Sequence, residues 1–279
     1  MNASGVWEKE VSSGSRFEFG ANWAGFLEHL APERIAAAEA SLKEMLEVDG
    51  LHGKTFLDIG SGSGLFSLAA RRLGARVTSF DYDPQCVACT SELKRRYYER
   101  DPDWSVSEAS ILDGDFLANL PTFDVVYSWG VLHATGDLWK ALDNASRLVS
   151  PGGLLFVAMY NDQGRASRLW RLVKRLYVKA PKPLKWTVLY PSLARLWGLS
   201  VVRDTLKGHP LRTWKAYSGR GMDAWHDVVD WVGGYPFDVA RPDEVFDFCR
   251  ERGFELRKLR TCGGGHGCNE FVFARADER

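Results

Sequence analysis

Three glycines separated by single residues, Gly60, Gly62 and Gly64, lie between two aspartates, Asp58 and Asp81. Glycine lets a backbone turn sharply and approach a ligand closely, because no side chain stands in the way. Asp81 follows a second apolar run, where a carboxylate is suited to hold the two hydroxyls of a ribose. The residue types and their spacing therefore predict a turn that binds a nucleoside.

The elements that must position these residues can be read from the stretch TFLDIGSGSGLFSLAARRLGARVTSFDYD, which starts at Thr55. Residues 55–59 form a short apolar run that predicts a strand, residues 65–73 have apolar side chains at helical spacing, and residues 76–80 predict a second strand. An open parallel sheet binds its ligand at the carboxyl ends of its strands. Both the glycines and Asp81 fall there.

The dinucleotide-binding fingerprint G-x-G-x-x-G does not fit this turn. Counted from Gly60, it requires glycine where the chain has Leu65. Counted from Gly62, it requires glycine where the chain has Ser67. The sequence therefore argues against a pyrophosphate ligand.

The pattern D-x-G-x-G-x-G that begins at Asp58 resembles the first motif of the class I S-adenosylmethionine-dependent methyltransferases. In that family the glycine loop passes under the methionine part of the cofactor, and the acidic residue after the second strand takes the ribose hydroxyls. The resemblance implies S-adenosyl-L-methionine as cofactor and S-adenosyl-L-homocysteine as product. A generic strand-to-helix turn with an incidental acidic residue is the alternative.

Later strands extend the resemblance to about Tyr160. Residues 104–109 and 123–128 predict a third and a fourth strand, and LVSPGGLLFVAMY predicts a turn followed by a fifth. The segment FDVVYSWGVLHAT closely resembles the fourth-strand motif of small-molecule methyltransferases of the ubiquinone and menaquinone type, where this end faces the transferring methyl group. The implied fold is α/β: a doubly wound, seven-stranded, mostly parallel sheet, Rossmann-like, with an N-terminal helical lid and a helical cap insertion after the fifth strand.

The resemblance assigns the cofactor-binding residues by their places in these motifs. They are Asp58, Gly60, Ser61, Gly62, Gly64, Asp81, Tyr82, Ser110, Ile111 and Ser128. Ser110 and Ile111 match the adenine-contacting position after the third strand, where Ser110 replaces the commoner aspartate.

Methyl transfer from a sulfonium displaces a neutral leaving group, so catalysis is mostly alignment, with a base needed only if the acceptor must lose a proton. His133, after the fourth strand, and His266, in a glycine-rich loop, are the first two candidate bases, although a lone histidine is often structural. Tyr160 is expected to orient the acceptor. The candidate acceptor-binding residues are Phe19, Trp23, Trp129, Asn161, His226 and Asn269; His226, beside Asp227, is also the third candidate base.

Four units are expected along the chain. They are a helical lid over residues 1–50, a cofactor-binding core over 51–162, a basic and aromatic helical cap over 163–235, and a closing helix with a β-hairpin over 236–279. In the cap, Lys and Arg recur with interleaved Trp and Tyr, and Asp204 is the only acid up to Arg220. Such a segment can bind nucleic acid, lie on an anionic membrane, close over an acidic or lipid-linked substrate, or pack its aromatics inward as a solvated cap.

Methylation of a small molecule, most simply at oxygen, is the first hypothesis. A methyltransferase of RNA or protein that docks through the cap is the second, and it predicts binding that weakens steeply with salt. A third hypothesis, a non-catalytic cofactor-binding scaffold, is disfavoured by the intact Asp58, glycines and Asp81. The sequence specifies neither the acceptor nor an oligomeric state.

Composition fits a soluble enzyme. Among the 279 residues, Lys plus Arg and Asp plus Glu number 36 each, so no net charge draws the whole chain to nucleic acid or membrane. Five cysteines, an odd number, suggest a reducing cytosol, and we expect neither export nor a transmembrane segment because no apolar run is long enough. Cys262, His266 and Cys268 match no common zinc spacing, so no metal site is expected.

Overall fold

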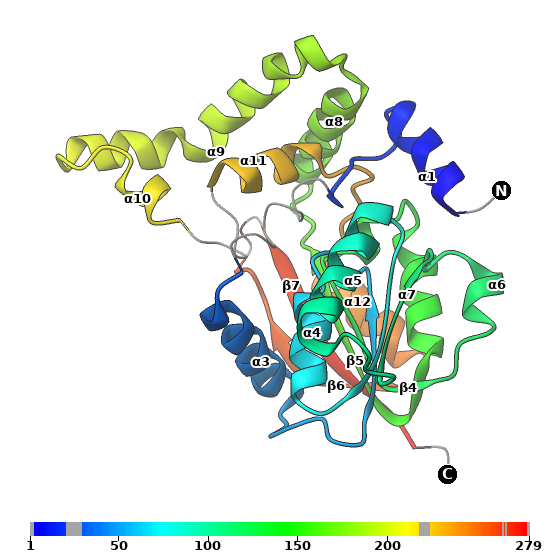
Figure 1. The fold of residues 1–279 in the computed structure, drawn as a ribbon. Helices are drawn as coiled ribbons and strands as arrows, with labels where there is room; N and C mark the ends of the chain where they lie inside the picture. The colour runs from blue at the N-terminus through cyan, green and yellow to red at the C-terminus, as the bar shows by residue number, and fades with distance from the viewer. Residues whose placement is uncertain (1–2, 21–29, 218–223, 264, 266, 278–279) are drawn as a thin grey trace.

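The computed structural model describes residues 3–20, 30–217, 224–263, 265 and 267–277 (Figure 1). These residues form a seven-stranded sheet in the order β3-β2-β1-β4-β5-β7-β6, in which only β7 runs antiparallel to its neighbours. The strands are β1 Thr55–Ile59, β2 Arg76–Asp81, β3 Trp104–Glu108, β4 Phe123–Trp129, β5 Val149–Tyr160, β6 Phe254–Arg260 and β7 Cys268–Arg275. The α/β, doubly wound, mostly parallel fold predicted from the sequence is confirmed.

Helices cover both faces of the sheet. On one face lie α3 Pro32–Leu46, α4 Leu65–Arg72 and α5 Pro84–Tyr98; on the other lie α7 Leu138–Arg147 and α12 Pro242–Arg250. The short helices α6 Gly114–Leu117 and η1 Leu132–Ala134 belong to connections. Along β1 the alternating side chains enter the two layers in turn, since Phe56 packs with α3 and α4 whereas Leu57 packs with α7.

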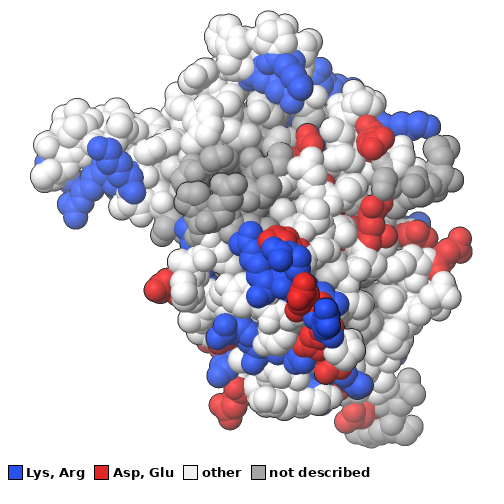
Figure 2. Space-filling view, viewed as in Figure 1, with Lys and Arg blue, Asp and Glu red and all other residues white. Residues whose placement is uncertain are grey.

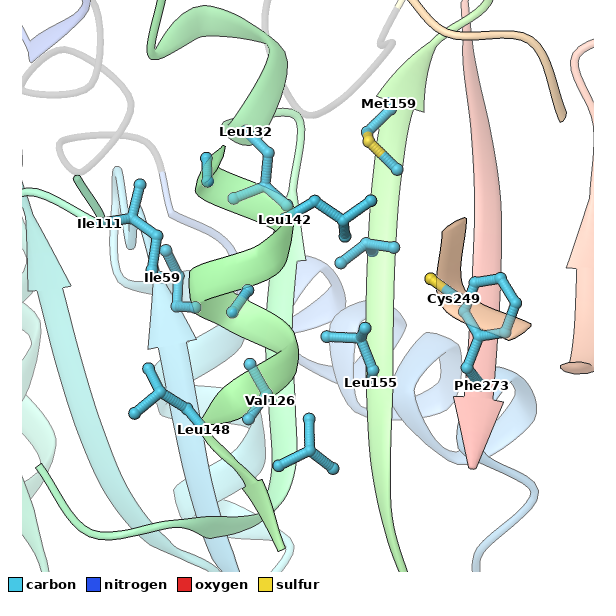
Figure 3. Packing of buried hydrophobic residues seen from close by; sticks show 14 of the residues in the cluster. Ile59, Ile111, Val126, Leu132, Leu142, Leu148, Leu155, Met159, Cys249 and Phe273 are labelled. Atoms are coloured by element: carbon cyan, nitrogen blue, oxygen red, sulfur yellow. The ribbon is translucent and has the colours of Figure 1, made fainter. Parts of the chain in front are cut away.

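The layer under α7 and α12 closes the core behind the ligand-binding edge. Leu142 of α7 packs in one cluster with Leu132 and with Leu155 and Met159 of β5 (Figure 3). Cys249 of α12 joins the same cluster. This apolar layer packs against the strands and so holds the polar residues at the strand ends in fixed positions.

The strand order changes direction between β1 and β4, because the chain runs outward from β1 to β2 and β3 and then returns to β4 on the other side. Such a switch point leaves a crevice at the carboxyl ends of the two strands, since their following connections diverge. The loop after β1 and Gly130, directly after β4, both lie there.

The cap is made of α8 Arg165–Lys179, η2 Lys182–Leu184, α9 Trp186–Leu206, α10 Arg212–Lys215 and α11 Ala224–Gly233 (Figure 1). Its own apolar cluster includes Trp170, Tyr177 and Val232. At its centre, Lys174 of α8 is fully buried; its ammonium donates a hydrogen bond to the carbonyl oxygen of Trp231 and lies 4.4 Å from the centre of the Trp231 ring. This lysine therefore fastens α8 to α11.

The N-terminal region divides between two places. Helix α3 packs on the sheet beside α4 through Ile35 and Leu42, as part of the core layer. Helix α1 (Ala3–Ser12) and the following segment instead reach the cap and the cofactor side of the sheet, because the Phe17 N–H donates to Tyr235 and the Gly20 N–H donates to Asp83. Division of the chain into separate units at residues 50, 162 and 235 stays a prediction.

Candidate active site

The loop after β1 has the backbone conformation that its glycines suggest. Gly60, Gly62 and Gly64 have φ angles of 75°, 55° and 79°, in the left-handed region that favours glycine. A Cβ on Gly60 would lie 2.4 Å from a methyl carbon of Val131, and a Cβ on Gly64 would lie 2.8 Å from Thr90 Cα. A side chain at Gly60 or Gly64 is thus disfavoured both by the backbone conformation and by the neighbouring atoms.

Asp81 ties this loop to the end of β2. Its two carboxylate oxygens accept hydrogen bonds from the N–H groups of Gly62 and Asp83, each at 2.9 Å. Burial raises the pKa of Asp81 to about 6, against the opposing effect of these N–H donors. Asp81 is the last residue of β2, and its contact with a ribose stays a prediction.

Asp58 lies at the end of a buried chain of hydrogen bonds. Ser67 donates to the Asp58 carboxylate at 2.5 Å, Ser67 and Ser79 are 2.7 Å apart at their hydroxyl oxygens, and the Trp104 indole N–H donates to Ser79 at 3.0 Å. Because the Ser67 proton is used on Asp58, the Ser79 proton must point to Ser67. All donors in the chain therefore point toward the carboxylate.

Burial also raises the pKa of Asp58, to about 7, and the nearby charge of Asp81 adds to the effect. In the part of the chain that the structure describes, neither carboxylate forms a salt bridge with Lys or Arg. Two buried acids without a cation fit a ligand that brings its own positive charge and hydroxyl donors. S-adenosylmethionine, with an ammonium, a sulfonium and a ribose diol, is such a ligand.

Several other predicted cofactor residues are engaged within the protein. The Ser61 hydroxyl hydrogen bonds with that of Thr90 at 2.9 Å. The buried Ser128 hydroxyl donates to the Ile59 carbonyl at 3.0 Å, which ties β4 to β1.

The predicted residues after β2 and β3 also have partners within the protein. The Ser110 hydroxyl accepts from the N–H of Leu112. Ile111 is buried, and its carbonyl accepts from Asn144. Tyr82 lies with its ring centre 4.9 Å from the Arg16 guanidinium. Their contacts with the cofactor stay predictions.

His133 and Tyr160 lie together where β4 and β5 end. Their ring centres are 3.9 Å apart, and His133 Nδ1 accepts the Tyr160 backbone N–H at 3.3 Å. Accepting at Nδ1 places any single ring proton on Nε2. His133 is only 1% exposed, and its carbonyl accepts the Asp238 N–H, so it joins three segments of the chain.

Replacing His133 tests whether its main role is to hold these three segments of the chain together. We expect His133→Leu to lower the free energy of unfolding by about 1–3 kcal/mol, because it leaves the Tyr160 N–H without its acceptor. His133→Asn should recover much of that loss, since its side-chain oxygen can accept the same N–H. Urea denaturation followed by tryptophan fluorescence measures both. Equal losses in the two variants would contradict the acceptor role.

A cavity of about 290 Å³ lies between the cap and the carboxyl ends of β4 and β5. Half of its described lining is aromatic, and the lining consists of Trp129, Tyr160, Leu196, Trp197, Tyr217, Asp227, Val228, Trp231, Gly267 and Cys268. Asp227 is the only charged residue of that lining, and its carboxylate accepts the Tyr217 hydroxyl proton at 2.8 Å. Among the candidate catalytic and acceptor-binding residues, Tyr160 and Trp129 belong to it, and His133 is not among its lining.

The remaining candidates fall around this cavity or outside the described residues. Asn269 donates to the Asn161 side chain at 3.0 Å and accepts the Cys262 N–H, so the two amides fix the loop between β6 and β7. Phe19 packs edge-on against Phe17, 5.0 Å between ring centres. Trp23 and His266 lie outside the described residues, and His226 lies in α11 with its side chain outside them.

The aromatic and acidic lining contributed by the cap was not assigned to the site from the sequence. Asp227 and Trp231 lie one helical turn apart on α11, so one helix face brings both into the cavity. That spacing, in the segment WHDVVDWV, was the available signal. Trp197 and Tyr217 come from α9 and from the chain after α10, and only the packing of the cap brings them to the same cavity.

This fold and this site define a class I S-adenosylmethionine-dependent methyltransferase. The family model described as "Methyltransferase domain" matches residues 23–213, and the chain belongs to that family.

Curated relatives named "Ubiquinone biosynthesis O-methyltransferase" are similar to the chain. The one from Methylocella silvestris is 32% identical over 148 residues, which are 48% of this chain and 55% of the relative. The one from Methylobacterium sp. (strain 4-46) is 30% identical over 223 residues, 76% of this chain and 83% of the relative. For the first four such relatives, the chain spans only about half of their length.

Solved structures of similar fold include the magnesium protoporphyrin IX methyltransferase from Synechocystis PCC 6803 with bound S-adenosylhomocysteine, at 14% identity. The TM-score is 0.50, with coverage of 88% of this chain and 83% of that one. An O-methyltransferase family protein from Burkholderia thailandensis has a TM-score of 0.51 at 13% identity, with coverage of 88% and 58%. These likenesses show the fold alone.

Two features are absent from the described residues. None of the helices they form is long and apolar enough to cross a membrane. Within the same part of the chain, no cluster of three or more His, Cys, Asp or Glu side chains is arranged to hold a metal ion.

Proposed function

We propose that this protein transfers the methyl group of S-adenosylmethionine to a hydroxyl oxygen of a small, ring-bearing acceptor. The observation that carries the proposal is the aromatic cavity that holds one carboxylate and opens beside Trp129, the last residue of β4. Flat apolar rings stack on Trp and Tyr side chains, and a carboxylate accepts hydrogen bonds from hydroxyl groups. The names of the curated relatives also favour oxygen as the acceptor atom.

The cofactor supplies an activated methyl group on a positively charged sulfur. In the transfer, a lone pair of the acceptor oxygen forms the new bond to the methyl carbon, and the electrons of the carbon–sulfur bond go to sulfur. The hydroxyl proton must leave to a base. The protein therefore has to align the acceptor and receive one proton.

Asp227 is the residue best suited to hold the acceptor hydroxyl. Its carboxylate accepts the Tyr217 proton, which fixes its orientation, and a carboxylate can accept several hydrogen bonds at once. It lines the same cavity as Trp129 and Tyr160, which lie at the carboxyl ends of β4 and β5. Tyr160, held by its stack on His133, then forms part of the wall against which the acceptor ring lies.

This cavity favours a neutral or cationic acceptor over an acidic one. The Asp227 carboxylate lines the cavity and repels an anion. An acidic substrate, which the basic composition of the cap suggests, is therefore disfavoured.

Methyl uptake from labelled S-adenosylmethionine tests the proposal even though the acceptor is unidentified. The enzyme is incubated with a bacterial extract that has been separated into small-molecule, protein and RNA fractions. We expect label in the small-molecule fraction, and at least tenfold less of it with Asp227→Asn. Asp243→Asn, which changes an exposed carboxylate on α12, serves as the matched control. Label confined to protein or RNA, or equal labelling by both variants, would overturn the proposal.

A further inference from the structure

The distal part of the cap projects from the body of the protein as an arm. This cap arm comprises residues 195–215, the C-terminal part of α9 and all of α10. In Figure 1 the yellow-green end of α9 extends past α3, and α10 folds back beneath it. Within the described residues, several apolar side chains of this arm are exposed to solvent.

An apolar stripe runs along the arm. Leu199 is 86% exposed, Leu206 is 84% exposed and Val202 is 56% exposed. Their positions follow the spacing of three and four residues that places side chains on one face of a helix. Single exposed apolar residues are normal on a protein surface, but a continuous stripe marks a contact with something apolar.

Basic side chains flank this stripe. Arg195, Arg203, Lys207, Arg212 and Lys215 are all exposed. The only acid of the arm, Asp204, has a buried side chain that accepts the Thr213 N–H and hydroxyl. Its charge interacts with Arg203 and Arg212, but the five cations outnumber it, so the arm keeps a net positive charge. On the face shown in Figure 2, the arm carries blue and white atoms and no red.

The two aromatic side chains of the arm, Trp197 and Trp214, pack together, and Trp197 also packs against Tyr217. The ring centres of Trp197 and Trp214 are 4.8 Å apart, and those of Trp197 and Tyr217 are 5.2 Å apart, both edge-on. Both Trp197 and Tyr217 line the acceptor cavity, whereas sequence-independent binding of a single strand uses rings that are open to successive bases. The exposed apolar side chains are aliphatic, and aliphatic groups gain little from RNA.

We propose that the cap arm binds the surface of an anionic lipid membrane. A helix with leucines on one face and Lys or Arg beside them lies in the membrane interface, with the apolar side chains among the lipids and the cations near the headgroups. A second copy of this chain fits less well, because two arms of the same positive charge repel each other. Since Leu196 and Trp197 of α9 line the acceptor cavity, binding through the arm would bring that cavity close to the lipid.

Vesicle co-sedimentation of the full chain tests this inference. The probes are vesicles of phosphatidylcholine alone and of phosphatidylcholine with phosphatidylglycerol at about three to one. We expect at least tenfold tighter binding to the anionic vesicles, weakened by added salt because the attraction is partly electrostatic. Leu199→Ser with Leu206→Ser should weaken that binding at least tenfold, and so should Arg203→Gln with Lys207→Gln.

Matched controls change similar residues outside the arm. Leu259→Ser replaces an exposed leucine on β6. Arg76→Gln with Lys140→Gln removes two exposed cations, one on β2 and one on α7. Each of these two control variants should bind vesicles as the original protein does. Unchanged S-adenosylhomocysteine binding by the arm variants shows that they are folded, so failure here would leave the methyltransferase proposal standing. Equal binding to neutral vesicles, no loss in the arm variants, or self-association that these variants abolish would overturn the inference.

Discussion

Asp81→Ala is expected to weaken binding of S-adenosylhomocysteine by about 100-fold or more. The proposed contact to the ribose consists of two hydroxyl donors on one carboxylate, and hydrogen bonds to charged groups contribute about 1.5–3 kcal/mol each. The substitution also removes the acceptor of the Gly62 and Asp83 N–H groups, so the glycine loop loses its tie to β2. Isothermal titration calorimetry of the purified protein measures the change directly.

Two further variants separate the contact from the fold. Asp81→Asn keeps one acceptor oxygen and should fall between the original protein and Asp81→Ala. Asp115→Ala, which removes an exposed carboxylate in the first turn of α6, should bind as the original protein does. If Asp81→Ala bound S-adenosylhomocysteine normally, or if the unaltered protein bound NAD in preference to it, the nucleoside assignment would be lost.

The core and the glycine loop were predictable because their signals are local. The apolar runs that predicted the first two strands match β1 and β2 within a residue, since buried parallel strands read as continuous apolar segments. Gly60 and Gly64 permit the positive φ angles that this turn has, which most other residues disfavour. The position of Asp81 beside Gly62 follows from parallel pairing of β1 with β2, which short βαβ units almost always adopt.

The acceptor side could not be read in the same way, because it is assembled from distant segments. Trp129 and Trp231 meet across a cavity although about a hundred residues of chain separate them. Lys174 belongs by sequence to a run of basic residues, yet it is fully buried among aromatic rings of the cap. The amino-acid composition gives the total charge of the cap, but it does not show which Lys and Arg side chains are exposed to water. That depends on tertiary packing.

The second large effect is expected at Asp58, where function and stability oppose each other. Its carboxylate has a pKa of about 7 in the folded protein, above the ordinary 3.8, because burial disfavours the charged form. A raised folded-state pKa means that stability is full below pH 3.8 and is lost as pH rises to about 7. At about 1.36 kcal/mol per unit, the cost above pH 7 is on the order of 4 kcal/mol.

Asp58→Asn should therefore stabilise the cofactor-free protein at pH 8 by up to about that amount, with the gain shrinking as pH falls toward 4. Asparagine resembles the protonated acid in shape and can still accept the Ser67 proton. Urea denaturation at several pH values measures the difference. Asp124→Asn is the control of opposite sign, because N–H and hydroxyl donors from Thr55 help hold the pKa of Asp124 below its ordinary value, so that variant should lose stability at pH 8.

Binding of the cofactor should reverse the order of stability of the original protein and Asp58→Asn. A positively charged ligand favours the ionised carboxylate, so it should raise the melting temperature of the original protein at pH 8 far more than that of Asp58→Asn. For the same reason, affinity of the original protein for S-adenosylhomocysteine, which keeps the ammonium, should fall as pH drops below about 7. Loss of stability in Asp58→Asn at pH 8 would contradict this account. The buried acid would then be a structural residue, rather than a charge that the fold maintains at a cost for binding its ligand.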